Sequence, residues 1–184
     1  GVPDRLRQGA RLVLAGARVA SNGGPGVFVQ ERAFADRIAF VEVADNSALG
    51  LGVTSGGSVA LMICDRFVST RMGTITPEDP SVRPFVVGDG VSLAQGAGAG
   101  ARLRVVDTEF SRNARFGVVL DGFDATLDDG VHGGNRGEEN GFGVGVYGAA
   151  SVDGSTSLGA IRGRSATIPV SAPTVRERVS PAGG

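Results

Sequence analysis

The sequence has no lysine and no tryptophan, and it has one cysteine, one histidine and one tyrosine among its 184 residues. All 18 basic residues are therefore arginine, and with 19 acidic residues the formal net charge is −1. This balance gives no electrostatic basis for binding nucleic acid. A single cysteine, Cys64, excludes an internal disulfide framework and a cysteine-rich zinc site. No run of 18 apolar residues is present, so no membrane span is predicted.

Glycine is abundant instead, at 31 residues, and the chain repeats. Residues 10–29 align without a gap with residues 101–120, sharing the pattern A-R-L-x-[LV]-x(4)-[VF]-x-x-N-x(3)-G-V-x-[VL]. An offset of 24 residues recovers further copies. We therefore predict six units, which begin at residues 10, 34, 58, 82, 101 and in the segment after 120, with a shortened fourth unit at 82–100.

Apolar residues alternate within each unit, as at Leu12, Leu14, Val27 and Val29. A period of two indicates strands. Units of 24 residues are too short to hold a strand, a crossover helix and their turns. The repeats are therefore expected to stack as a solenoid, in which each turn of chain pairs with the turn before it.

Stacking at this offset predicts three inward rows and one outward row of side chains. The inward rows are Leu14, Ile38, Met62, Val86 and Val105; Val19, Val43, Phe67, Val91 and Phe110; and Val27, Leu51, Ile75, Val118 and Val144. The outward row is Arg18, Glu42 and Arg66, whose alternating charges suggest a surface ladder.

Short strands, a turn asparagine and then Gly-Val-x-Val recur every 22–26 residues. Over residues 10–150 this pattern resembles the right-handed parallel β-helix repeat proteins of the pectate-lyase-like superfamily. The resemblance rests on Asn22, Asn46 and Asn113 and the glycines behind them. It implies an all-β fold, a right-handed parallel β-helix (solenoid) of about six coils, with the asparagines as a structural turn ladder.

We expect one domain at residues 1–162, with residues 1–9 as a possible N-terminal cap, and a proline-containing tail at 163–184. The superfamily includes lyases, hydrolases, epimerases and non-catalytic surface proteins, so the resemblance specifies a fold more than an activity.

The main candidates for chemistry lie between residues 121 and 141. In β-helix lyases, carboxylates on successive coils bind calcium, which makes Asp121, Asp124, Asp128 and Asp129 a possible calcium cluster. The stretch from Asp128 to Gly134 is similar to the Asp-Asp and Gly-His-Gly motifs of polygalacturonases, but those enzymes carry the two motifs on different coils.

Proteins of this kind also place binding surfaces on loops that project from the rigid solenoid. The residues of that candidate surface are Asp128, Asp129, His132, Asn135, Arg136, Glu138 and Glu139.

The favoured function is a structural or binding segment of a bacterial secreted or cell-surface protein, in contact with carbohydrate or, through its coil ends, with another protein chain. The alternatives are a polysaccharide lyase, hydrolase or epimerase domain, and a self-assembling module. Scarce aromatic residues, the absence of lysine and the lack of a clear carboxylate pair argue against an enzyme. No catalytic residue, no metal ligand and no cofactor are assigned.

Overall fold

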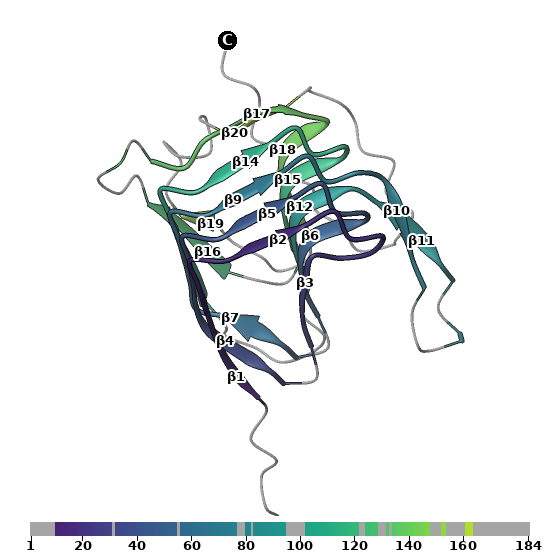
Figure 1. Cartoon of the computed structure of the whole chain (residues 1–184), viewed down its shortest axis with the longest axis horizontal. Helices are drawn as coiled ribbons and strands as arrows, with labels where there is room; N and C mark the ends of the chain where they lie inside the picture. The colour runs from purple at the N-terminus through teal and green to yellow at the C-terminus, as the bar shows by residue number, and fades with distance from the viewer. Residues whose placement is uncertain are drawn as a thin grey trace, which may run out of the picture.

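The computed structural model describes residues 10–30, 32–54, 56–76, 80–81, 83–94, 102–121, 124–128, 132, 134–147, 152–153 and 161–163. These residues form strands and turns without a helix, and the strands stack in parallel through about five turns (Figure 1). The predicted all-β parallel solenoid is confirmed. Among the same residues, no helix has the length and apolar character needed to cross a bilayer. The predicted cap at 1–9 and the tail after residue 163 lie outside the described residues.

Three parallel sheets form the sides of the solenoid, and each of the first four coils contributes to all three sheets. Sheet A contains β1 (Arg11–Ala15), β4 (Phe34–Ala39), β8 (Leu61–Ile63), β13 (Arg102–Val106), β16 (Asp124–Asp128) and β19 (Val152–Asp153), with β7 (Ser58–Val59) beside β4. Sheet B contains β2 (Arg18–Ala20), β5 (Glu42–Ala44), β9 (Arg66–Val68) and β14 (Glu109–Ser111). Sheet C contains β3 (Val27–Val29), β6 (Leu49–Val53), β12 (Asp89–Ala94), β15 (Phe116–Asp121) and β18 (Phe142–Tyr147).

Two smaller pairings complete the fold. Strands β10 (Gly73–Ile75) and β11 (Phe85–Val87) form an antiparallel hairpin that projects from the side of the stack (Figure 1). Strand β17 (Gly137–Asn140) pairs in parallel with β20 (Ile161–Gly163) and lies over β14, to which Glu109 and Arg136 connect it by a parallel bridge.

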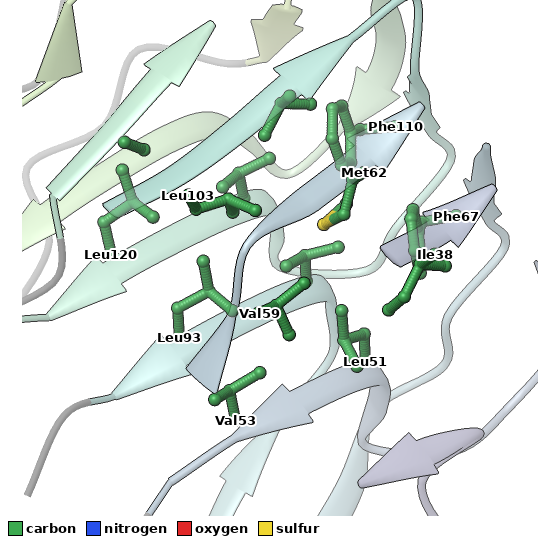
Figure 2. Packing of buried hydrophobic residues seen from close by; sticks show 14 of the residues in the cluster. Ile38, Leu51, Val53, Val59, Met62, Phe67, Leu93, Leu103, Phe110 and Leu120 are labelled. Atoms are coloured by element: carbon green, nitrogen blue, oxygen red, sulfur yellow. The ribbon is translucent and has the colours of Figure 1, made fainter. Parts of the chain in front are cut away.

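The core is a set of stacked rows, because residues in register on neighbouring coils point the same way. Ile38 pairs with Met62, and Met62 pairs with Val105. Phe67 pairs with Phe110 on sheet B, where their rings stack with centroids 5.8 Å apart. Figure 2 shows these side chains pointing toward one another between the sheets. The hydrophobic rows are thus continuous from coil to coil, and most members are fully buried.

The predicted fourth coil is wrong: strands β7, β8, β9 and β12 belong to one coil. Strand β13 pairs directly with β8, so the stacked residues are 43 positions apart at this step. Val86 and Ile75 lie in the hairpin, and Val86 is 55% exposed. Val91 takes the place predicted for Ile75 in the sheet C row, between Leu51 and Val118. The hairpin is an insertion that leaves the solenoid after β9 and returns to it at β12.

Asparagines stack at the turn between sheets B and C. The Asn22 backbone N–H and side-chain amide both donate to Oδ1 of Asn46, at 3.1 and 2.8 Å. Asn113 donates in the same way to Oδ1 of Asn140, at 3.0 and 2.9 Å. Asn140 was not predicted as a member, because three extra residues precede it relative to Asn113. These asparagines therefore form a column that joins the first coil to the second through part-buried hydrogen bonds and the fourth coil to the fifth through buried ones.

Thr70 occupies the third coil's place in this column and interrupts it. Its backbone N–H donates to Oδ1 of Asn113 at 3.1 Å, but its buried Oγ1 has no hydrogen-bond partner among the described residues. Gly50 on the neighbouring coil has no side chain beside that oxygen; a Cβ there would lie 3.3 Å from it. The equivalent contact of Gly26 with the Asn46 amide would be 2.7 Å, so glycine makes room for the amide there.

We expect Thr70→Asn to stabilise the chain by about 1 kcal/mol, because the longer side chain places an acceptor where Asn46 and Asn113 already have one. Urea unfolding of the variant and the parent measures the difference. Thr70→Val is the control: it removes the unpartnered hydroxyl without adding an acceptor and should be close to neutral. A Thr70→Asn variant less stable than Thr70→Val would show that this turn does not accept the amide.

The predicted charge row on sheet B is present. Arg18 contacts Glu42 at 2.9 Å, Glu42 contacts Arg66 at 3.0 Å, and Arg66 reaches Glu109 at 3.0 Å. The backbone bridge from Glu109 to Arg136 places a fifth residue of alternating charge in line. These side chains are partly exposed, so each ion pair adds little to the stability of the fold and mainly favours the correct register of the strands.

Glu42→Arg puts like charges next to one another on this row, and we expect a cost of no more than about 1–2 kcal/mol. The loss is small because water and salt screen the exposed arginines. Urea unfolding at low and at high salt measures it, and the penalty should shrink as salt is added. A salt-independent loss well above this range would mean that Glu42 has a packing role.

Candidate functional site

A groove of about 290 Å³ lies over the upper edge of sheet B, between β14 and β17. Its lining is polar and charged, and consists of Glu109, Ser111, Arg112, Arg136, Gly137, Glu138 and Glu139. Three of these, Arg136, Glu138 and Glu139, belong to the loop predicted as a binding surface. The structure adds three from the preceding coil, Glu109, Ser111 and Arg112, because β17 stacks on β14.

The backbone fixes the walls of the groove. Arg112 N–H donates to the carbonyl of Glu138 at 2.9 Å, and Glu138 N–H donates to Ser111 Oγ at 3.3 Å. Arg112 directly follows β14 and Glu139 lies within β17, and both have positive φ, at 57° and 59°. The two residues thus occupy equivalent left-handed positions on adjacent coils.

The charged groups of the groove are available to a ligand. The side chains of Arg112, Arg136, Glu138 and Glu139 are exposed and form no ion pair within the part of the chain that the structure describes. Glu109 is already held by Arg66 at 3.0 Å. A guanidinium can donate two parallel hydrogen bonds to a carboxylate, and a carboxylate can accept from hydroxyl groups. The groove can therefore hold a polar ligand that carries both.

Asn135 is part of the scaffold rather than of the binding surface. It is 1% exposed, its Oδ1 accepts from Thr108 N–H at 3.0 Å, and its Nδ2 donates to the carbonyls of Val105 and Asp128. Both N–H donors of the amide are thus used, and the side chain is buried, so Asn135 does not present its amide to a ligand. The sequence predicts only that Asn135 lies in a loop, and asparagine is common in loops whether its amide faces solvent or bonds to the backbone.

Two of the aspartates considered for calcium, Asp124 and Asp128, lie at opposite ends of one strand. Asp124 and Asp128 are the two ends of β16, which separates them by about 13 Å. Asp128 forms an ion pair with Arg104 on the adjacent strand. Asp121 ends β15 in a different sheet. Asp129 lies outside the described residues.

His132 lies instead at the turn between sheets A and B, where successive coils bring it beside Cys64 and Asp107. One ligand atom from each of the three side chains lies within 4.8 Å of the others. The Asp107 Oδ1 accepts backbone N–H bonds from His132 at 3.1 Å and from Gly134 at 2.9 Å. Among the described residues, this is the one cluster of three such side chains close enough to share a metal ion.

The electrostatics of this turn are set by buried and stacked carboxylates. Partial desolvation, followed by the negative charges of Asp107 and Asp65, raises the pKa of the Cys64 thiol. Desolvation raises the pKa of Asp65 to about 6, against the hydrogen bonds that it accepts from the N–H groups of Val41 and Ile63. These acidic groups give the turn a negative local field once they ionise.

The sequence indicates that two of the three residues, Cys64 and Asp107, share a repeat position, but it does not place the third. Cys64 and Asp107 occupy the same repeat position, which follows β8 and β13 directly, and both have positive φ, at 54° and 49°. His132 could not be placed, because the segment between β16 and β17 is longer than the equivalent turns. Comparison of the chain with protein-family models, with curated proteins and with solved structures finds no match.

Proposed function

We propose that this chain is a non-catalytic binding segment of a secreted or cell-surface protein, and that the groove over β14 and β17 binds an acidic polysaccharide. The observation that carries the proposal is the lining of the groove, in which two exposed arginines, Arg112 and Arg136, and two exposed glutamates lie together over stacked strands. The arginines suit the carboxylate of a uronate, and the glutamates suit its hydroxyl groups.

The same lining favours binding over turnover. Breaking a uronate polymer by elimination needs positive charge on the substrate carboxylate and a base at the α-proton. The groove has guanidinium groups for the first task, but guanidinium remains protonated and is a poor base. Of the glutamates beside them, Glu138 and Glu139 are exposed to solvent, and Glu109 is held by Arg66 in an ion pair.

The experiment is titration of the chain with pectate and alginate oligosaccharides, followed by calorimetry. We expect binding in the micromolar to millimolar range that weakens with salt. Arg112→Ala with Arg136→Ala should weaken it ten-fold or more. Arg37→Ala is the matched control, since that exposed arginine lies on sheet A, away from the groove. Equal binding by the double variant and the parent would contradict the proposal.

The enzyme alternative is tested in the same mixtures, incubated with and without calcium. A lyase would release unsaturated products that absorb in the ultraviolet, and we expect none. Calcium-dependent turnover abolished by Asp128→Ala or Asp129→Ala would replace the binding proposal with the lyase. Neutral dextran serves as the ligand control, because it offers hydroxyl groups without carboxylates.

A further inference from the structure

We infer that Cys64, Asp107 and His132 form a transition-metal site, of the type that holds Zn²⁺, at the turn between sheets A and B. The three side chains come from three successive coils and lie together only because the coils stack. One potential ligand atom of each lies within 4.8 Å of the other two. This site is separate from the groove and does not depend on the polysaccharide proposal.

The backbone places the first two ligands. Ile63 pairs with Val106, and Cys64 N–H donates to the carbonyl of Val106 at 3.0 Å, so Cys64 and Asp107 follow paired residues. Both then turn with positive φ, which directs their side chains from the same corner of adjacent coils. Strand spacing of about 4.8 Å sets the distance between the two turns, so a small change of side-chain torsion brings thiol and carboxylate onto one ion.

The third ligand is held by the second. The Asp107 Oδ1 accepts hydrogen bonds from the backbone N–H groups of His132 and Gly134, at 3.1 and 2.9 Å. These bonds fix the segment that carries the imidazole against the carboxylate. Hydrogen bonds of this kind orient ligating carboxylates in metal centres, and they leave the thiol and imidazole to complete the set.

The donor set selects the class of metal. A thiolate, an imidazole and one carboxylate suit Zn²⁺ and related divalent transition metals, whereas Ca²⁺ and Mg²⁺ prefer oxygen ligands alone. Three protein ligands leave a fourth tetrahedral position for water or for a group from a partner molecule. The site lies at the surface, since His132 is exposed and Cys64 is half-buried, so an ion can enter it.

The rest of the turn column limits the site to these coils. The positions equivalent to Cys64 on the first two coils are Gly16 and Phe40, neither of which is a metal ligand. Phe40 is 66% exposed and lies beside Cys64 on the adjacent coil. The metal site is therefore a local feature of the third, fourth and fifth coils and does not repeat along the solenoid.

The composition makes the test unusually sharp. The chain has one cysteine and one histidine, so thiolate and imidazole ligation can come from only these two residues if the protein carries no affinity tag. Tag-free, reduced protein is titrated with Co²⁺, which reports its ligands by absorption, and then with Zn²⁺ by calorimetry. We expect one ion per chain, a thiolate-to-cobalt charge-transfer band, tetrahedral visible absorption, and displacement of Co²⁺ by Zn²⁺.

Cys64→Ser should abolish the charge-transfer band and weaken Zn²⁺ binding at least ten-fold, and His132→Ala should weaken it to a similar degree. Asp45→Asn is the matched control, since Asp45 is an exposed aspartate with positive φ at the other turn. Thermal melts of each apo variant verify folding. Zn²⁺ should raise the melting temperature of the parent but not of Cys64→Ser.

Three results would overturn the site. The first is a cobalt spectrum without sulfur ligation in reduced, folded protein. The second is Zn²⁺ affinity unchanged in both Cys64→Ser and His132→Ala. The third is a stoichiometry of one ion per two chains with dimer formation, which would place the cysteine of one chain and the ligands of another on the ion.

Discussion

Phe110→Asp should leave the chain without a cooperative thermal transition. The Phe110 side chain is fully buried in sheet B and its ring stacks on Phe67 at 5.8 Å between centroids. Removing a buried phenylalanine costs about 3–5 kcal/mol, and an unpaired buried carboxylate adds several more. A domain of this size has about 5–15 kcal/mol of stability in total, so the combined loss is of the same order.

Phe40→Asp is the control for this result. Phe40 directly follows β4, but its side chain is 66% exposed and its φ is +55°, a conformation that aspartate tolerates. We expect this variant to melt near the parent's midpoint, as measured by circular dichroism and calorimetry. A cooperative melt of Phe110→Asp near that midpoint would contradict the placement of Phe110 in the core.

Arg115→Met should destabilise the chain by about 3–5 kcal/mol, because it leaves the buried Asp89 without its counter-charge. Asp89 is 0% exposed at the start of β12, and Arg115 contacts both of its carboxylate oxygens, with Nε 2.7 Å from Oδ1. Phe116 N–H donates to the same Oδ1 at 3.2 Å. The pair thereby connects the returning hairpin insertion to the next coil.

The loss should depend on pH in a defined direction. Burial raises the pKa of the Asp89 carboxyl, and the Arg115 guanidinium opposes that rise. Without Arg115 the folded-state pKa rises further above its unfolded value, so the folded variant binds a proton more tightly than the unfolded chain does. The penalty is therefore smallest below about pH 4 and grows as pH rises through the folded pKa.

Urea unfolding of the parent and of Arg115→Met at pH 4 and pH 7 measures this difference. Arg115→Met with Asp89→Asn is the control, since it removes the buried charge together with its partner. We expect the double variant to recover much of the loss at pH 7 and to lose the added pH dependence. Equal losses at both pH values would mean that Arg115 acts through packing alone.

The sequence predicts the architecture of the first two coils in detail. Alternating apolar residues at a 24-residue offset place Ile38 on Leu14 and Val43 on Val19, and the pairing of the strands confirms both. These predictions hold because a period-two pattern fixes which face is buried, and a one-residue slip would expose it. The charge row of Arg18, Glu42 and Arg66 follows from the same register.

The prediction fails where an insertion breaks the offset. Val86 and Ile75 alternate as well as any core residues, because a hairpin strand has the same period as a solenoid strand. The usable signal was Gly90-Val91-Ser92-Leu93, which repeats the Gly-Val-x-Val motif of Gly26 and Gly117 and belongs to β12. The 24-residue offset instead predicts Val91 in the row of Val43 and Phe67, whereas Val91 lies in sheet C.

The candidate sites could be predicted only in part, since both depend on which coils are adjacent. The loop residues Arg136 and Glu138 were identified from sequence, whereas Glu109 and Arg112 enter the groove from a neighbouring coil. Cys64 and Asp107 are 43 residues apart and share a repeat position, but only the stacking of β8 on β13 makes them neighbours. To predict that these side chains are neighbours, the length of the third coil must be known correctly.

Disulfide trapping of the third coil tests this register most directly. In a Cys64→Ser background, Leu61→Cys with Arg104→Cys joins two outward-facing residues that pair between β8 and β13. Leu61→Cys with Phe85→Cys joins the residues that a uniform 24-residue repeat would stack. Both proteins are oxidised when folded, and peptides are mapped by mass spectrometry without reduction. We predict a 61–104 disulfide and no 61–85 disulfide; the reverse result would contradict the 43-residue coil and the grouping of Cys64 with Asp107.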